Sequence, residues 1–331
     1  MPSVPPPGPQ AVLLLAHGTP DTLDEMSEYL SKVTGGRALP EEVVKELQHR
    51  YAEIGLRDDP LPGGPALTRW TIEQARLLSE ALGQKVYVGM RNWHPYIAET
   101  LETMRADGVR SFRAICLAPQ NSRTSTGLYR SATAAAAAGM QMDFIAGWAD
   151  HPLLAEAFAE RLTPVYEAAR AQTRAPVPVL FTAHSVPCRT IMTGEASLTG
   201  ARPGTPAQAT PDPYPVEAKH TAELVAERVG LDPANWFFAF QSQGVSGGPW
   251  IGPTVEDTLE ALRAAGHTGV VIQPVGFLCD HVEILYDIDI AFTALAEQLN
   301  LRLWRAGSLN DSPLLIRALA EIATGNAPQT P

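Results

Sequence analysis

Short apolar runs of strand length alternate with amphipathic helical stretches along this chain, and the whole pattern occurs twice. The first run, 11–16 (AVLLLA), ends at Gly18 and Pro20, and glycine also follows several of the helical stretches, where it is the usual stop. Alternation of this kind predicts parallel sheets with helices on both faces. Strands are expected at 11–16, 85–90, 112–117, 142–145, 177–182, 236–240 and 269–275. Helices are expected at 23–33, 41–54, 68–82, 96–106, 152–171, 215–229, 254–265 and 283–299.

The repeated pattern predicts an α/β protein with two similar Rossmann-like, doubly wound domains and a cleft between them. We expect an N-terminal domain over 11–160 and a C-terminal domain over 161–308, followed by a helix and tail over 309–331 that pack back. Residues 1–10 are rich in proline and predict a disordered leader. Residues 192–211, rich in Gly, Pro, Ala and Thr, predict a surface insertion.

Charge and composition exclude several classes of protein. The formal net charge is −11, and there is no Lys/Arg cluster of the kind that nucleic-acid binding requires. No run approaches the ~20 apolar residues of a membrane-spanning helix. We therefore expect a cytoplasmic protein. The three cysteines are too few for an ordinary iron–sulfur cluster, which takes four thiolates, so none is expected.

A histidine follows the predicted strand 177–182 directly, in the sequence Ala183-His184-Ser185. Ligands of doubly wound sheets bind beyond the carboxyl ends of the strands, so this position suits a catalytic group. A structural histidine is the competing interpretation.

A stripe of acidic residues follows the apolar strand 269–275. Asp280, His281, Glu283, Asp287 and Asp289 stand at the start of the expected helix, and Glu283 and Asp287 are four residues apart, hence on one helical face. A solvent-facing acidic side is one explanation. The other is a site that binds a cation or moves protons, because unpaired buried carboxylates are costly.

Several motifs in order resemble those of ferrochelatases. They are LLLAHGTP, HRYAEIG, GMRNWHPYI and LAPQNS in the first half, and AHSVP, DPYP, FQSQG, PWIGP and PVGFLCDHVEILYDID in the second. The likeness covers about residues 11–325, and DHVEILYD is the most specific piece.

The resemblance implies an enzyme that inserts Fe²⁺ into a porphyrin, protoporphyrin IX or coproporphyrin III, and releases two protons. It implies His184 and Glu283 as the catalytic pair. A neutral imidazole accepts pyrrole protons near neutral pH, and imidazole and carboxylate both bind ferrous iron. Metal contacts are expected from His184, Glu283, Asp287 and His17. Porphyrin contacts are expected from His17, Arg37, Arg50, Arg91, Ser122, Arg123, Phe240 and Trp250.

Some positions depart from the family pattern. His17 stands where the bacterial members have a tyrosine, which leaves two roles open, an iron ligand or a residue that lines the cleft. Thr34 and Gly35 replace a pair of arginines, and Ala291 replaces the last carboxylate of the acidic series. Two alternatives to a ferrochelatase stay open, a cobalt or nickel chelatase for another tetrapyrrole and a non-catalytic haem or porphyrin carrier. Haem handover to a transient partner protein is also expected.

Overall fold

The structure is a computed structural model, and it describes residues 9–192, 210–244 and 248–326. Most of the predicted leader and insertion, and the last residues of the tail, lie outside the described residues. The chain forms two compact units. The first unit comprises 1–117, 126–148 and 311–331, and the second comprises 118–125 and 149–310. The domain boundaries expected from the sequence stay a prediction.

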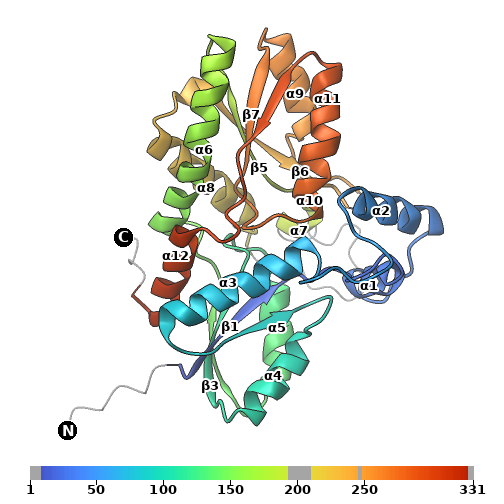
Figure 1. The fold of residues 1–331 in the computed structure, drawn as a ribbon, viewed down its shortest axis with the longest axis vertical. Helices are drawn as coiled ribbons and strands as arrows, with labels where there is room; N and C mark the ends of the chain where they lie inside the picture. The colour runs from blue at the N-terminus through green and yellow to red at the C-terminus, as the bar shows by residue number, and fades with distance from the viewer. Residues whose placement is uncertain (1–8, 193–209, 245–247, 327–331) are drawn as a thin grey trace. The chain divides into compact units, whose positions relative to one another are not determined.

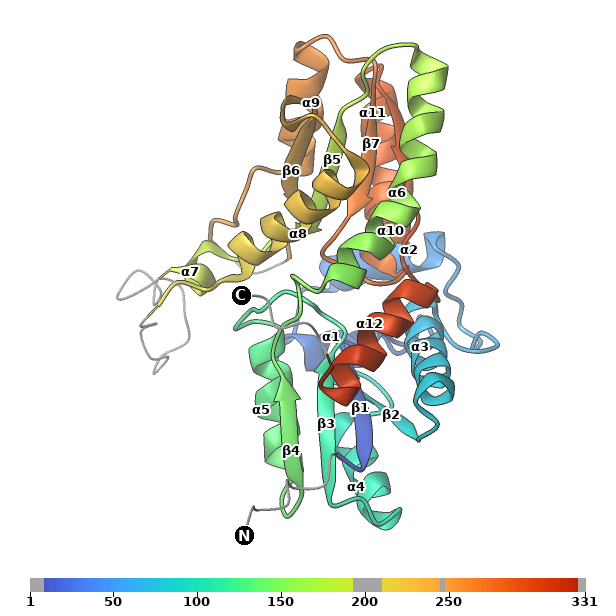
Figure 2. The same ribbon diagram turned by 90° about the vertical axis from the view of Figure 1, so that its left-hand side faces the viewer.

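The first unit is built on a parallel sheet of four strands in the order β2-β1-β3-β4. These are β1 (Ala11–Ala16), β2 (Val86–Met90), β3 (Ser111–Cys116) and β4 (Gln141–Ile145). Its helices are α1 (Met26–Val33), α2 (Glu41–Glu53), α3 (Ala66–Leu82), α4 (Ile97–Ala106), α5 (Thr126–Ala136) and α12 (Pro313–Thr324). Helices α4 and α5 share one apolar core with β1 and β3. The C-terminal helix α12 packs against α3, as Figures 1 and 2 show.

The second unit repeats this architecture with a parallel sheet in the order β6-β5-β7-β8. Its strands are β5 (Val179–His184), β6 (Trp236–Gln241), β7 (Gly269–Pro274) and β8 (Arg302–Arg305). Its helical segments are α6 (Pro152–Thr173), α7 (Cys188–Ile191), α8 (Tyr214–Val229), the 3₁₀ turn η2 (Pro233–Asn235), α9 (Val255–Ala264), α10 (Val282–Leu285), the π-helix η3 (Asp287–Phe292) and α11 (Thr293–Gln298). Helices α9, α10 and α11 bury their apolar residues against the sheet together with η3.

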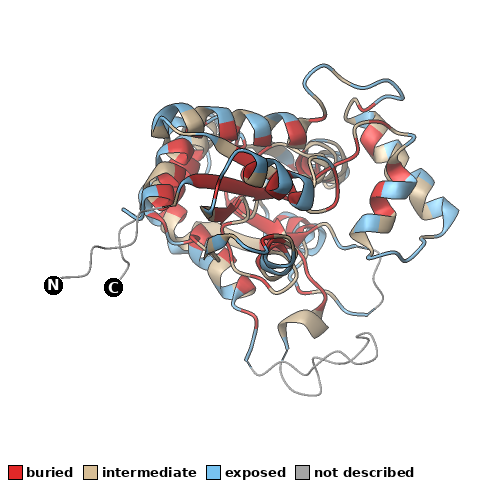
Figure 3. Cartoon of the chain, turned by 90° about the horizontal axis from the view of Figure 1, so that it is seen from below, coloured by how far each residue is buried: buried red, intermediate tan, exposed pale blue. Residues whose placement is uncertain are grey.

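The strands form the buried layer of each unit, which Figure 3 shows in red. All six residues of β1 and all six of β7 are buried, because helices cover both faces of a parallel sheet. This explains why these strands read as continuous apolar runs rather than as alternating ones. The predicted fold class, two Rossmann-like α/β units, is confirmed.

Three local predictions differ from the structure. The strand expected at 177–182 is Val179–His184, so His184 is its last residue rather than the second residue after it. The strand β8 was not expected, because it is only four residues long and arginine stands at both of its ends. The helix expected at 283–299 is interrupted by the π-helix Asp287–Phe292, in which the Ala291 amide reaches the Tyr286 carbonyl at 2.9 Å. Hydrophobic periodicity does not reveal such an interruption.

Candidate active site

His184 and Glu283 meet at the carboxyl edge of the second sheet. His184 ends β5, and Glu283 lies in α10, shortly after β7, which is the neighbour of β5 in the sheet. The His184 Nε2 atom is 3.1 Å from the Glu283 Oε1 atom, and both side chains are about one-third exposed, at 34% and 29%. The hydroxyl of Tyr214 donates a hydrogen bond of 2.8 Å to the His184 carbonyl and fixes the main chain there.

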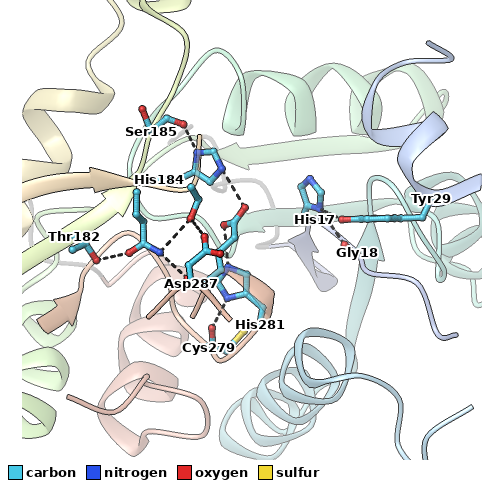
Figure 4. A network of polar contacts seen from close by, with 12 residues as sticks. His17, Gly18, Tyr29, Thr182, His184, Ser185, Cys279, His281 and Asp287 are labelled. Atoms are coloured by element: carbon cyan, nitrogen blue, oxygen red, sulfur yellow. Dashed lines mark hydrogen bonds and ion pairs between the residues drawn. The ribbon is translucent and has the colours of Figure 1, made fainter. Parts of the chain in front are cut away.

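His281 completes this arrangement from the other side of the carboxylate. Its Nε2 atom is 3.2 Å from Glu283 Oε2, so the two carboxylate oxygens each face one imidazole. Figure 4 shows His184 and His281 with Asp287 in one cluster of polar contacts. The rings of Phe277 and His281 are also in contact, with centroids 4.7 Å apart. His281 was not predicted from the sequence to have a role, although its place in the motif DHVE, two residues before Glu283, could have indicated one.

Each imidazole also faces a backbone carbonyl through its other nitrogen. His184 Nδ1 contacts the Ser185 carbonyl, and His281 Nδ1 lies 2.9 Å from the Cys279 carbonyl. A carbonyl only accepts, so both Nδ1 atoms donate, and each neutral ring then presents a lone pair to Glu283. The two contacts between the imidazole rings and Glu283 become hydrogen bonds only when each ring also carries a proton on Nε2. The cluster of His184, Glu283 and His281 therefore has room for two protons beyond those of two neutral rings and an ionised carboxylate.

The pKa values reflect the same contacts. Burial opposes the charged imidazole of His184, but the Glu283 carboxylate outweighs it, with smaller help from the Ser185 carbonyl and Asp287, and the pKa of His184 is raised. Burial likewise opposes ionisation of Glu283, yet the two neighbouring histidines hold the pKa of this carboxyl well below its usual range. The pair thus favours imidazolium beside carboxylate, and a raised pKa makes the neutral ring of His184 a better base.

Asp280 anchors the segment that carries these groups. Its carboxylate accepts hydrogen bonds from Ser308 Oγ at 2.7 Å and Asn310 Nδ2 at 2.9 Å, and it lies 3.4 Å from Arg305. Arg305 is also paired with Asp289 in a two-pronged contact of 2.5 and 3.0 Å. These contacts make two of the four carboxylates of this segment, Asp280 and Asp289, structural groups.

Asp287 is the first residue of the π-helix and accepts a hydrogen bond from the hydroxyl of Ser242. Among the described residues no group of three or more His, Cys, Asp or Glu side chains is arranged to hold a metal ion. The predicted metal contacts of His184, Glu283, Asp287 and His17 with the iron substrate stay a prediction.

His17 occupies the corresponding strand end in the first unit. It follows β1, and its Nε2 atom is 2.9 Å from Asn92 Nδ2. Its Nδ1 atom lies 3.0 Å from the Gly18 carbonyl and 3.3 Å from the Tyr29 hydroxyl, as Figure 4 also shows. With Nδ1 donating and Nε2 accepting from the amide, a neutral ring satisfies these contacts without a carboxylate.

The predicted porphyrin contacts fall into different environments. Trp250 lies near His184, with ring centroids 6.4 Å apart, whereas Phe240 is 6% exposed and packs in the core, which leaves little of its ring for a ligand. Ser122 is buried, and its hydroxyl contacts Thr124 at 2.9 Å. These three contacts stay predictions.

The four predicted arginines are also not alike. Arg37 is exposed, and Arg50 forms an ion pair with Glu46 at 3.0 Å. Arg123 donates to the Thr190 carbonyl, just before the predicted insertion, and to the Thr210 carbonyl near its end. Within the described part of the chain, the buried Nε of Arg91 has no hydrogen-bond partner.

Comparison with known proteins identifies the family. The profile of the ferrochelatase family matches residues 9–327. A ferrochelatase of Acidobacterium capsulatum is 59% identical over 316 residues, covering 95% of this chain and 93% of that protein. A coproporphyrin III ferrochelatase of Geobacillus kaustophilus is 32% identical over 322 residues, covering 94% of each.

The solved structure of SirB from Bacillus subtilis with Fe³⁺ shares the fold. Its TM-score is 0.52 at 11% identity, and the match covers 96% of this chain and 97% of that one. The chain belongs to the ferrochelatase family, the enzymes that insert ferrous iron into a porphyrin in haem synthesis.

Proposed function

We propose that His184 is the base that removes the pyrrole protons of the porphyrin, that the Glu283 carboxylate stabilises the protonated ring, and that His281 is the second proton acceptor of the cluster. The observation that supports this proposal most directly is the distance of 3.1 Å between His184 Nε2 and Glu283 Oε1, with His281 facing the other carboxylate oxygen. Insertion of Fe²⁺ breaks two pyrrole N–H bonds, and the two nitrogens then bind the iron. The two protons released equal the two that the His184–Glu283–His281 cluster can take up while gaining hydrogen bonds.

Iron is proposed to reach the ring through the carboxylate of Asp287 and then Glu283. Carboxylate and imidazole are suitable ligands for Fe²⁺, and both residues stand on the same short helical segment. Asp287 also contributes to the raised pKa of His184, which places its charge within electrostatic range of that ring. His17 is proposed as a residue that lines the porphyrin site, with its Nε2 atom facing the Asn92 amide at 2.9 Å.

Arg91 is the favoured partner for a propionate of the porphyrin. It follows β2, its buried Nε has no hydrogen-bond partner among the described residues, and its guanidinium carbon lies 5.9 Å from the Tyr129 ring centroid. A carboxylate would supply the missing acceptor. Protoporphyrin IX and coproporphyrin III both carry propionates, and coproporphyrin III has two more. Comparison of kcat/KM on the two porphyrins assigns the substrate.

The remaining proposals concern cofactor, location and partners. We propose that the enzyme carries no iron–sulfur cluster, because burial raises the pKa of the Cys116 and Cys279 thiols to about 12 and so disfavours thiolate ligands. No helix in the described residues is long and apolar enough to cross a membrane. A cytoplasmic location, and transfer of the product to a partner protein, are proposed as expected from the sequence.

The test is anaerobic metalation followed by absorbance. His184→Ala is expected to reduce insertion of Fe²⁺ by at least about 10³-fold, while porphyrin binding, measured by fluorescence, stays within a few fold. His220→Ala, which removes an exposed histidine paired with Glu223, serves as the matched control and keeps full turnover. Unchanged turnover of His184→Ala would show that the base is misassigned.

A further inference from the structure

Ser242 follows β6 and has a backbone conformation that few residues other than glycine adopt. Its φ is +65°, in the left-handed region. Such a conformation is strained and persists only where the surroundings impose it. A glycine here would remove that strain, so the presence of serine calls for a reason that its side chain supplies.

The neighbouring Gln241 fixes the Ser242 side chain. Gln241 is buried, and its Oε1 accepts a hydrogen bond of 2.7 Å from the Thr182 hydroxyl of β5. Its Nε2 donates to the Glu283 carbonyl at 2.7 Å and to Ser242 Oγ at 3.3 Å. Because Ser242 Oγ accepts from this amide, its own proton is directed toward another acceptor.

That acceptor is Oδ2 of Asp287, to which the Ser242 hydroxyl donates. A hydrogen bond to an ionised carboxylate is about twice as strong as one between neutral groups. Asp287 begins the π-helix, an irregularity that is rare in proteins and frequent at functional sites. A chain of hydrogen bonds thus runs from β5 through Gln241 and Ser242 to Asp287, and it also holds the backbone of Glu283.

We infer that Ser242 is a positioning residue for iron entry: its hydroxyl, held by Gln241 and by the left-handed backbone, orients the Asp287 carboxylate for the incoming ferrous ion. The inference rests on the proposed role of Asp287 as the carboxylate that receives Fe²⁺. Ser242 itself contacts neither the porphyrin nor the metal in this scheme. We therefore expect loss of the hydroxyl to raise KM for Fe²⁺ and to leave KM for the porphyrin and kcat nearly unchanged.

The experiment compares Ser242→Ala, Ser242→Gly, Asp287→Asn and the double variant Ser242→Ala/Asp287→Asn. Initial rates are measured anaerobically, with Fe²⁺ varied at saturating porphyrin and the reverse. Both Ser242 variants are expected to raise KM for Fe²⁺ by at least about fivefold, the loss of one hydrogen bond to a charged group. The kcat value and KM for the porphyrin are expected to stay within about twofold, as does every parameter of the control Ser131→Ala on the exposed face of α5.

The glycine variant separates the hydroxyl from the backbone. Glycine adopts a positive φ without strain, so Ser242→Gly keeps the turn and loses only the hydrogen bonds. A raised KM for Fe²⁺ in the alanine variant and a normal one in the glycine variant would assign the effect to the backbone and overturn the inference. If Ser242→Ala does not fold, the glycine variant alone carries the test.

The Asp287 variants separate this inference from the proposed function. An unchanged KM for Fe²⁺ in Asp287→Asn would remove the proposed role of Asp287. A raised KM in Asp287→Asn with normal values in both Ser242 variants would overturn the inference alone. The double variant is expected to match Asp287→Asn, because the two residues act through one hydrogen bond, and multiplied effects would contradict this.

Discussion

The two units present a histidine at the same topological position and give it different partners. The strand orders β2-β1-β3-β4 and β6-β5-β7-β8 are equivalent, and the sequences AHGTP and AHSVP end β1 and β5. Ala16 pairs with Met90 as Ala183 pairs with Phe240, so His17 and His184 correspond. His17 meets the amide of Asn92 at 2.9 Å, whereas His184 meets the carboxylate of Glu283 at 3.1 Å.

The difference arises in the segment after the third strand of each unit. Leu15 pairs with Cys116 as Thr182 pairs with Pro274, and Ser125 and Glu283 stand equally far beyond those two positions. The segment after β3 therefore has a hydroxyl where the segment after β7 has the carboxylate. The residues before Ser125 contact the second unit's own helix α8, since the Asn121 amide donates to Glu217 at 2.6 Å. One fold thus provides two histidine positions, and we expect proton uptake at the one that faces Glu283.

Removal of the carboxylate tests this comparison most severely. Glu283→Gln is expected to lower turnover by about 10²–10³-fold, because the carboxylate that stabilises the protonated His184 is lost. Without the carboxylate, burial dominates and the pKa of His184 falls, so the acidic limb of the pH profile of kcat/KM moves to lower pH. The measurement is a pH–rate profile, with exposed Glu297→Gln as control. If the acidic limb of the profile does not move, the group that titrates there is not His184.

Loss of the anchor at Asp280 is expected to show as stability. Asp280→Ala leaves the donors of Ser308 and Asn310 without their acceptor and is expected to lower the free energy of unfolding by about 2–3 kcal/mol. Ser122→Ala, at the corresponding position of the segment after β3, is expected to cost about 1 kcal/mol or less. Urea unfolding of both variants measures the difference, and equal losses would contradict the asymmetry between the segments.

His281 is expected to have a smaller effect on turnover than Glu283. In His281→Ala the carboxylate keeps its contact with His184 but loses the second imidazole, so kcat is expected to fall about tenfold. His281→Gln, which retains a donor, is expected to recover part of the loss. Single-turnover absorbance separates the insertion step from product release, and a normal insertion rate in His281→Ala would exclude it from proton transfer.

The smallest effect is expected at the histidine of the first unit. His17→Gln keeps a polar side chain of similar length beside Asn92, so kcat is expected to change by less than about threefold. The same substitution at His184 is expected to abolish turnover. Loss of activity in His17→Gln comparable to that in His184→Gln would mean that the carboxylate does not distinguish the two positions.

The sequence determined the fold class, since continuous apolar strands that alternate with amphipathic helices bury a parallel sheet on both faces. It also predicted His184 and Glu283 as the catalytic pair, because the motifs around them resemble those of ferrochelatases. The fold class and the pair could be predicted because hydrophobic periodicity and sequence motifs are properties of short stretches of the chain.

Side-chain partners were decided by tertiary structure alone. The fixation of Asp287 by Ser242, the contact of His281 with the second oxygen of Glu283, and the π-helical interruption of the last helix join residues by geometry that no periodicity encodes. The tertiary structure likewise placed Asp280 and Asp289 with Arg305, and His17 with Asn92. The sequence showed which groups are present, and the packing of the strand ends decided which of them share a proton.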